Sequence, residues 1–167
     1  PTAIFDGGSG TKADPYLIAT ADQLRAFAAA VNEEEHFAGE YIVLTADIDL
    51  AGRKWVPAGN AGAHCFSGIF DGQNHKILGL RIGTEETPAD YVAAGLFAYA
   101  DGAIIRNVAI ENAQINIKRT DSVRIYAGIV AGVMDKSETG AGALITNCAV
   151  SGTVSASSKD WSTVGGI

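Results

Sequence analysis

The chain has 167 residues, of which 47% are hydrophobic and 19% are charged, and its formal net charge at pH 7 is −7. This composition excludes an intrinsically disordered protein, and the length is enough to bury one sizeable core. The sequence has no basic stripe for nucleic acid and no apolar run near the roughly 18 residues that span a bilayer, so we expect neither nucleic-acid binding nor membrane insertion.

Residues 1–40 predict an N-terminal cap that contains one clear helix signal. A turn-rich loop leads to a short strand at 16–18, and the helix is expected at about 21–32. Thr20 and Gln23 have the spacing of a capping box, in which each side chain satisfies a free backbone N–H at the helix start. One apolar face follows at helical spacing: Leu24, Phe27, Ala28 and Val31.

From residue 41 onward the pattern is that of repeated β-strands. The three most similar segments are 76–82, 104–110 and 144–150. Each places an apolar residue two positions before a Gly or Asn and others one and three positions after it. The residues aligned at the Gly or Asn position are Asp47, Gly79, Asn107 and Asn147. The apolar columns that result are Ile48, Leu80, Val108 and Cys148, and Leu50, Ile82, Ile110 and Val150, with Asp49, Arg81, Ala109 and Ala149 expected to face outward between them.

Motifs that recur every few dozen residues indicate a solenoid, in which each unit buries its apolar face against its neighbours. These repeats are rich in Ile, Val and Gly and lack a helical period. We therefore predict an all-β fold, a parallel β-helix, in which the stacked rungs occupy residues 41–167 of a single domain, 1–167. The Gly or Asn of each repeat suits a corner with left-handed φ, Asn107 and Asn147 can share amide hydrogen bonds, and the early helix would cover the first rung.

The same motifs resemble the GLUG-repeat family of bacterial surface proteins. The segments that carry the resemblance are 127–132, which reads Ala-Gly-Ile-Val-Ala-Gly, and 145–154, which reads Ile-Thr-Asn-Cys-Ala-Val-Ser-Gly-Thr-Val. The resemblance implies a right-handed parallel β-helix, an extracellular or cell-surface location and no catalytic residue in this stretch. Such repeats also occur in immunoglobulin A peptidases, as accessory parts. The final residues 164–167 look like the start of another repeat, so we expect further repeats of the same polypeptide.

Polysaccharide lyases and hydrolases with a β-helical fold place charged residues across neighbouring rungs. The candidates for such a role are Asp49, Asp71, Arg81, Asp101 and Arg106. Asp71 and Asp101 precede glycines and are typical of turns. Asp49 and Arg81 share a column and suit an exposed ion pair of little energetic weight. Arg106 is expected to lie beside Leu78 and Thr146, with no charged cluster around it, so we predict no catalytic residue.

Metal and thiol chemistry is not favoured either. Asp47 and Asp49 alternate on one strand, but Ca²⁺ needs six or more oxygen ligands and no second acidic cluster is predicted nearby. Cys65 and Cys148 are not part of a Cys-x-x-Cys motif, and we expect both to be buried thiols. The sequence thus predicts no metal site and no cofactor.

Three aromatic residues, Tyr91, Tyr126 and Trp161, lie in or beside the predicted loops. They are the candidate binding residues, because such rings stack on sugars, although the same rings also anchor loops by packing. We favour a non-enzymatic module of an exported bacterial surface protein, acting as an adhesin, a spacer or a recognition surface for a glycan or a host surface protein. The alternative is a carbohydrate-active enzyme, a polysaccharide lyase or glycoside hydrolase, or its substrate-binding part.

Overall fold

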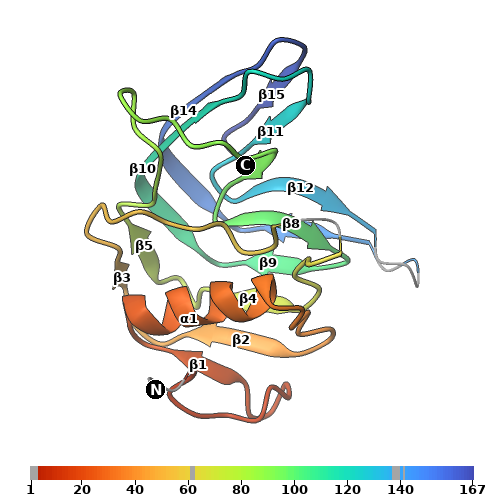
Figure 1. Cartoon of the computed structure of the whole chain (residues 1–167). Coiled ribbons are helices and arrows are strands. Elements are labelled where there is room, and N and C mark those ends of the chain that lie inside the picture. The colour runs from red at the N-terminus through yellow and green to blue at the C-terminus, as the bar shows by residue number, and fades with distance from the viewer. Residues whose placement is uncertain (1–3, 61–62, 137–139, 141) are drawn as a thin grey trace.

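The computed structural model describes residues 4–60, 63–136, 140 and 142–167. In these residues the chain forms one helix, α1 (Ala21–Asn32), and a series of short strands whose pairings are all parallel (Figure 1). The predicted all-β class and the predicted helix bounds are therefore confirmed.

The strands form four parallel sheets. The first has the order β1 (Tyr16–Ile18), β2 (Tyr41–Leu44), β4 (Ile69–Asp71), β9 (Ile104–Arg106), β13 (Leu144–Thr146). The second has the order β14 (Ala149–Ser157), β10 (Ala109–Lys118), β5 (Lys76–Leu78), β3 (Ile48–Asp49), and β6 (Arg81–Ile82) also pairs with β10. The third is β15 (Ser162–Val164), β11 (Ile125–Ala127), β7 (Ala93–Ala94), and the fourth is β12 (Ala131–Asp135), β8 (Phe97–Asp101).

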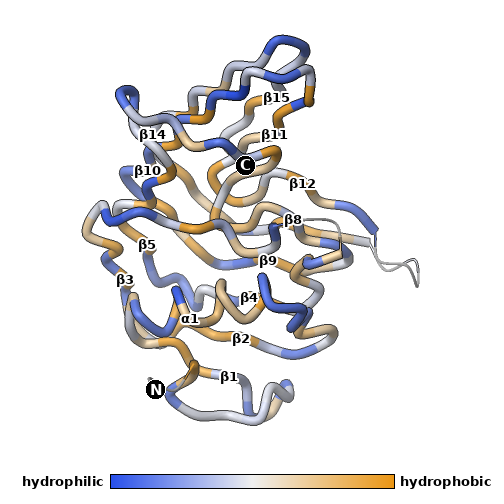
Figure 2. The backbone as a smooth tube through the Cα atoms, in the orientation of Figure 1, coloured by the Kyte–Doolittle hydropathy of each residue, from blue (hydrophilic) through white to orange (hydrophobic). Residues whose placement is uncertain are grey.

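From β4 onward the chain visits these sheets in a fixed order. It runs through β4, β5, β7 and β8, repeats the order with β9, β10, β11 and β12, and returns to the first sheet with β13. Each sheet thus collects one strand, or in the second sheet the pair β5 and β6, from each successive repeat. Hydrophobic and hydrophilic residues alternate along β10 and β14, as expected for strands with one face toward a core (Figure 2).

The register of the repeats is partly as predicted. Ile110 pairs with Val150, which confirms that part of the inner column. On the other side, however, Ile110 pairs with Ile77, and the expected partner Ile82 pairs with Ile115. The first copy of the repeat was therefore aligned out of register.

The alignment is out of register because two different corners of a repeat have the same left-handed backbone conformation. Asn74 is the residue level with Asn107, to whose carbonyl its N–H donates (2.8 Å), and its φ is +64°. Gly79 (φ +69°) lies at the next corner, between β5 and β6, where its N–H donates to the carbonyl of Glu111 (3.0 Å). Since Gly and Asn both favour left-handed φ, a Gly or Asn marks a corner without saying which corner it is.

Helix α1 begins with the predicted capping box. The Thr20 hydroxyl accepts a hydrogen bond from the Gln23 N–H (3.2 Å), and Gln23 Oε1 accepts from the Thr20 N–H (3.0 Å). The predicted apolar face is buried: Leu24, Phe27, Ala28 and Val31.

The centre of the core is a group of aromatic rings around Phe27 of α1. Its ring lies 5.5 Å from that of Phe66, 6.0 Å from that of Phe70 and 6.3 Å from that of Phe97. These rings come from α1, β4, β8 and the segment before β4, so the helix is packed against two sheets at once. In Figure 1, α1 lies beside β2 and β4.

Candidate functional site

A hollow of about 670 Å³ opens between the turn after β3 and the loop after β6. Its volume falls within the roughly 300–1,000 Å³ typical of ligand sites. The residues that line it are Gly52, Arg53, Lys54, Arg81, Gly83, Thr84, Thr87, Pro88 and Ala89. We call this feature the basic hollow.

The first wall is a tight turn that follows β3. Ala51 (φ +53°) and Gly52 (φ +60°) are both left-handed, and the Arg53 N–H donates to the Leu50 carbonyl (3.0 Å). The two left-handed residues and this hydrogen bond reverse the chain. Arg53 and Lys54, which follow the reversal, are exposed to solvent.

Arg81 of β6 faces this turn. Lys54 and Arg81 form a parallel β-bridge, and the Trp55 N–H donates to the Arg81 carbonyl (2.7 Å). The Trp55 ring is buried, and its Nε1–H donates to the Leu96 carbonyl (3.2 Å). Arg81 Nη1 donates to the Gly52 carbonyl (3.3 Å). The backbone of Arg81 is therefore fixed relative to the turn, and one nitrogen of its guanidinium group is held in place.

The second wall is the loop from Gly83 to Ala89. The Thr84 N–H donates to the Thr87 carbonyl (3.0 Å), the Thr87 N–H donates to Thr84 Oγ1 (3.0 Å), and the two hydroxyl oxygens are 2.8 Å apart. The Ala89 N–H donates to the Asn116 carbonyl on β10 (2.9 Å). These bonds fasten the loop at its tip and at its end, and the threonine hydroxyls lie in the lining.

The charge of the basic hollow is opposite to that of the whole chain. Arg53, Lys54 and Arg81 are exposed, and none of the three forms an ion pair with a described residue. No lining residue is acidic; Glu85 and Glu86 belong to the same loop but are not among the lining residues. Two guanidinium groups and an ammonium group suit a carboxylate, sulfate or phosphate, and Arg can bind such groups with two parallel hydrogen bonds.

Sequence reasoning missed this site because the alignment placed Arg81 beside Asp49. The expected ion pair is absent: Asp49 pairs with Leu78 and its Oδ1 accepts the Ala51 N–H (2.7 Å). The available signal was the adjacent pair Arg53-Lys54 directly after Gly52 in an acidic chain.

The aromatic candidates gather on one sheet but do not line the basic hollow. Tyr126 lies in β11, Tyr91 precedes β7 and Trp161 precedes β15. Because Tyr126 pairs with Ala93, and Ile125 with Ser162, the register puts Tyr91 and Trp161 on either side of Arg124. Trp161 is 67% exposed, whereas Tyr91 is half-buried against the core. Trp161 is thus the candidate with the most free ring surface.

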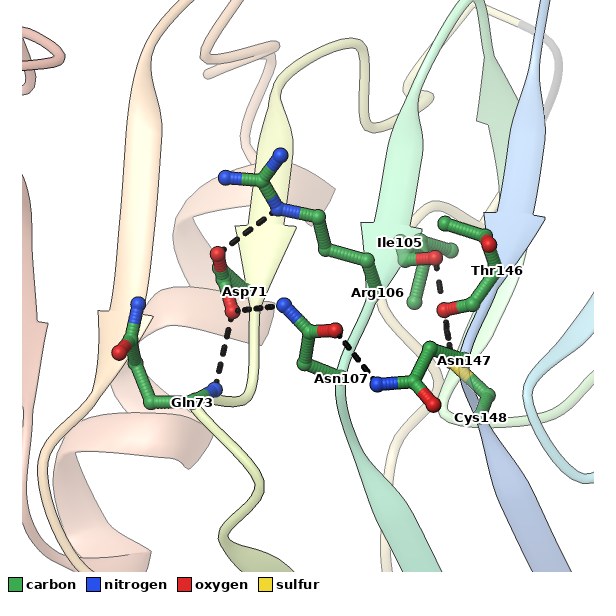
Figure 3. A network of polar contacts seen from close by, with 8 residues as sticks. All are labelled: Asp71, Gln73, Ile105, Arg106, Asn107, Thr146, Asn147 and Cys148. Carbon is green, nitrogen blue, oxygen red and sulfur yellow. Dashed lines mark hydrogen bonds and ion pairs between the residues drawn. The ribbon is translucent and has the colours of Figure 1, made fainter.

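Two of the charged candidates of the sequence, Asp71 and Arg106, form a structural contact with each other (Figure 3). Asp71 is 3% exposed, and its Oδ2 accepts a hydrogen bond from Arg106 Nε (2.7 Å). Its Oδ1 accepts from Asn107 Nδ2 (3.0 Å) and from the Gln73 N–H (2.9 Å). The predicted isolation of Arg106 is therefore wrong, because Arg106 pairs in register with Asp71.

The polar contacts of Asp71 also set its protonation. Burial raises the pKa of its carboxyl, but the hydrogen bonds from Asn107, Gln73 and Arg106 outweigh that effect, and the pKa lies below its usual value. Asn147 Nδ2 in turn donates to Asn107 Oδ1 (2.8 Å), which confirms the amide contact predicted between neighbouring repeats. These hydrogen bonds hold the corners of neighbouring repeats in place, so we interpret the network as structural.

The thiols lie in surroundings that do not activate them. Cys65 is buried and Cys148 is half-buried, and burial raises the pKa of each thiol. His36 Nδ1 is 3.9 Å from Cys65 Sγ but only 2.9 Å from the Cys65 carbonyl, so the carbonyl takes its contact. Within the described ranges, no three or more His, Cys, Asp or Glu residues lie together in a way that could hold a metal ion. The same residues contain no helix long and apolar enough to cross a membrane.

Comparisons with known proteins found a similar sequence and a similar solved structure. A protein of Evansella cellulosilytica described as a "Putative Gly-rich membrane protein" is 33% identical over 137 residues, which cover 80% of this chain and 15% of that protein. Among solved structures, the chain is similar to "a putative immunoglobulin A1 protease from Bacteroides ovatus", with a TM-score of 0.60, 24% identity, and coverage of 90% of this chain and 51% of that chain.

Of these two comparisons, the structural one bears on the fold. The structural likeness shows a shared fold, and the curated relative carries a membrane-protein name. No family model matches the chain, so membership of the GLUG-repeat family stays a prediction. The chain spans about 15% of the length of its curated relative and about half of the solved chain.

Proposed function

We propose that the chain is a non-enzymatic recognition module of an exported bacterial surface protein, and that it binds an anionic group of a glycan in the basic hollow. The observation that carries the proposal is the presence of three cations, Arg53, Lys54 and Arg81, in one hollow without an acidic lining residue. An acidic chain gains nothing in folding from collecting like charges at one place, because they repel one another. A bound anion would offset that repulsion.

The scaffold in this proposal is a right-handed parallel β-helix with residues 1–40 as its cap and 41–167 as its stacked rungs. It is supported by the fixed order in which the chain visits its four parallel sheets, and by the likeness to the Bacteroides ovatus structure. Such a scaffold fixes each turn relative to the next rung. The Arg53–Lys54 turn and Arg81 would then keep their spacing without a ligand, which reduces the ordering cost of binding.

The proposed location is the cell surface or the extracellular space. The name of the Evansella cellulosilytica relative points to a membrane-associated protein, and the motif resemblance of the repeats points to export. The partner we favour there is an acidic polysaccharide of a cell surface, and Tyr91, Tyr126 and Trp161 would offer a separate place for sugar stacking on the β7–β11–β15 sheet.

Calorimetric titration tests this proposal with oligosaccharides of one length and different charge. We expect tri-galacturonic acid to bind and neutral maltotriose not to bind, with affinity that falls as salt rises because the contact is between exposed charges. Arg53→Gln and Arg81→Gln should each weaken binding about tenfold or more, which is the effect of losing roughly 1.4 kcal/mol. Lys12→Gln removes one positive charge at an exposed position that lies outside the hollow and outside the β7–β11–β15 sheet, so it is the matched control and should bind as the parent does.

Two outcomes would contradict the proposal. Equal binding of the charged and neutral trisaccharides would remove the role of the cations. Release of unsaturated or reducing ends in proportion to protein and time would instead favour the alternative, a polysaccharide lyase or glycoside hydrolase.

A further inference from the structure

A second, smaller hollow adjoins the basic hollow. Its volume is about 260 Å³, and it lies between one face of α1 and the segment from Lys54 to Val56, with the charged residues Arg25 and Glu33 also in its lining. Lys54 lines both hollows, so the two are adjacent at this residue. We call the second feature the apolar hollow, because its main walls are Ala28 and Ala29 on one side and Trp55 and Val56 on the other.

Two features of the apolar hollow point to a ligand. Val56 is a large hydrophobic residue that is 49% exposed, although Trp55 beside it is buried. Asn32, at the end of α1, donates from Nδ2 to the Pro57 carbonyl (3.1 Å), but its Oδ1 is buried and accepts no hydrogen bond from a described residue. A buried acceptor without a partner is uncommon, and it favours a ligand that brings an N–H or O–H donor.

The two hollows together define one kind of ligand. The cations of the basic hollow favour a ligand with an anionic group. The walls of the apolar hollow and the Asn32 acceptor favour a small apolar group next to a hydrogen-bond donor. An acetamido group supplies both of the latter in its methyl group and its N–H. We propose that the ligand is an acidic sugar that also carries an N-acetyl group, with its carboxylate between Arg53 and Arg81 and its acetamido group in the apolar hollow beyond Lys54.

A peptide with an acidic and an apolar side chain has similar groups, but the backbone in the hollow does not suit it. Peptides commonly bind by adding a strand to a free sheet edge. Here Lys54 is already bridged to Arg81, and the Trp55 N–H is already bonded to the Arg81 carbonyl (2.7 Å). A sugar needs side-chain contacts alone, which the two hollows provide.

This inference rests on the proposed function, and one titration series separates the two. The probes are lactose, lactose carrying a terminal N-acetylneuraminic acid, and the same trisaccharide with a hydroxyl in place of the acetamido group. We expect the acetylated trisaccharide to bind about tenfold tighter than the hydroxyl analogue, the low end for one group in an apolar pocket. Lactose should not bind detectably.

Variants locate the difference. Ala29→Gln puts a longer, uncharged side chain on an exposed helix position and should remove the preference for the acetylated sugar, with binding of the hydroxyl analogue unchanged within about twofold. Ala26→Gln, on the same helix but outside both hollows, should keep the preference. Arg81→Gln should weaken both charged sugars alike.

The failures are distinguishable. Equal affinity for the two charged sugars, or an equal preference in the Ala29→Gln variant, would overturn the role of the apolar hollow and leave the basic hollow intact. Absence of binding by both charged sugars would overturn this choice of ligand, and absence of binding by tri-galacturonic acid as well would overturn the proposed function. Tighter binding of N-acetyl-leucyl-aspartate than of either sugar would overturn the choice of a sugar ligand.

Discussion

Arg106 Nε donates a 2.7 Å hydrogen bond to Asp71 Oδ2, across the boundary between two neighbouring strands of the first sheet. One partner is almost fully buried and the other reaches solvent, so the contact joins the interior of the chain to its surface. The same carboxylate also holds the corner at Gln73 and the side chain of Asn107. Asp71 is thus a single residue on which two successive corners depend.

The first prediction concerns the pH dependence of stability through Asp71. Its folded-state pKa lies below its unfolded value, which is about 3.9. Its stabilising contribution is therefore present above about pH 4 and is lost as pH falls through the lowered folded-state pKa. Asp71→Asn should destabilise the protein by about 1–3 kcal/mol at pH 7, since it weakens several bonds to a buried acceptor. It should also reduce the acid dependence of unfolding.

Urea unfolding between pH 2.5 and 7 measures both effects. The difference in unfolding free energy between the parent and Asp71→Asn should shrink as pH falls below about 4 and through the lowered folded-state pKa, because Asp71 then becomes protonated first in the unfolded and next in the folded parent. A constant difference over the whole range would show that the charge of Asp71 does not contribute.

The second prediction concerns the register around β10. Ile110 is fully buried between Ile77 and Val150, whereas its neighbour Ala109 is only half-buried. Ile110→Asp should destabilise severely, by more than about 4 kcal/mol, because it places an unpaired charge in the core. Ala109→Asp, the matched control one position away, should cost far less. Thermal denaturation followed by circular dichroism compares them, and equal shifts in Tm would contradict the inward position of Ile110.

These residues show how far sequence reasoning reaches in this chain. The pairing of Ile110 with Val150 and the contact of Asn107 with Asn147 could be predicted, because both repeats carry an Asn at the same corner of the motif. Helix α1 could be predicted because its signals are local. The position of Gly79 could not, since its left-handed corner looks the same as that of Asn74 in sequence.

The candidate site depended on the part of the register that was mistaken. Placing Gly79 level with Asp47 put Arg81 beside Asp49, which suggested a neutralised pair. In the structure, Arg81 is bridged to Lys54 instead, so that like charges meet and the hollow becomes positive. The misplacement of one corner therefore made the sequence predict a neutral surface where the structure has a positively charged one.

The third prediction concerns the two thiols. Burial raises the pKa of Cys65 and of Cys148, so the reactive thiolate is scarce at neutral pH. The Cys148 side chain also packs against the core, and its Sγ lies 3.3 Å from the Thr146 carbonyl. A thiol reagent such as 5,5′-dithiobis(2-nitrobenzoic acid) should label both residues slowly at pH 7.5 and rapidly after unfolding in guanidinium chloride. Complete labelling of the folded protein within the mixing time would contradict an inward Cys148.

The last prediction concerns the margin formed by β13, β14 and β15. Within the described residues each of these strands is paired on one side in its sheet, so the other side presents free backbone donors and acceptors. Leu144 on β13 is 49% exposed and Val164 on β15 is 47% exposed, so the same margin carries apolar side chains. A long apolar edge of this kind pairs readily with another chain unless a charge or a cover blocks it.

We therefore expect these 167 residues, expressed by themselves, to associate as concentration rises, with the β13–β15 margin as the contact. Leu144→Lys should shift the association to at least about tenfold higher concentration, because lysine on an edge strand must be desolvated when a second edge docks. Val123→Lys changes a comparably exposed hydrophobic residue outside that margin, at 38% exposure, and should leave association unchanged. Sedimentation velocity over a hundredfold concentration range measures the shift.

Adding one further repeat after residue 167 should suppress association in the same way and raise the Tm, since the added strands would cover β13 to β15. A parent protein that stays monomeric throughout this range, with no gain in Tm on extension, would show that the margin is already protected by its own side chains.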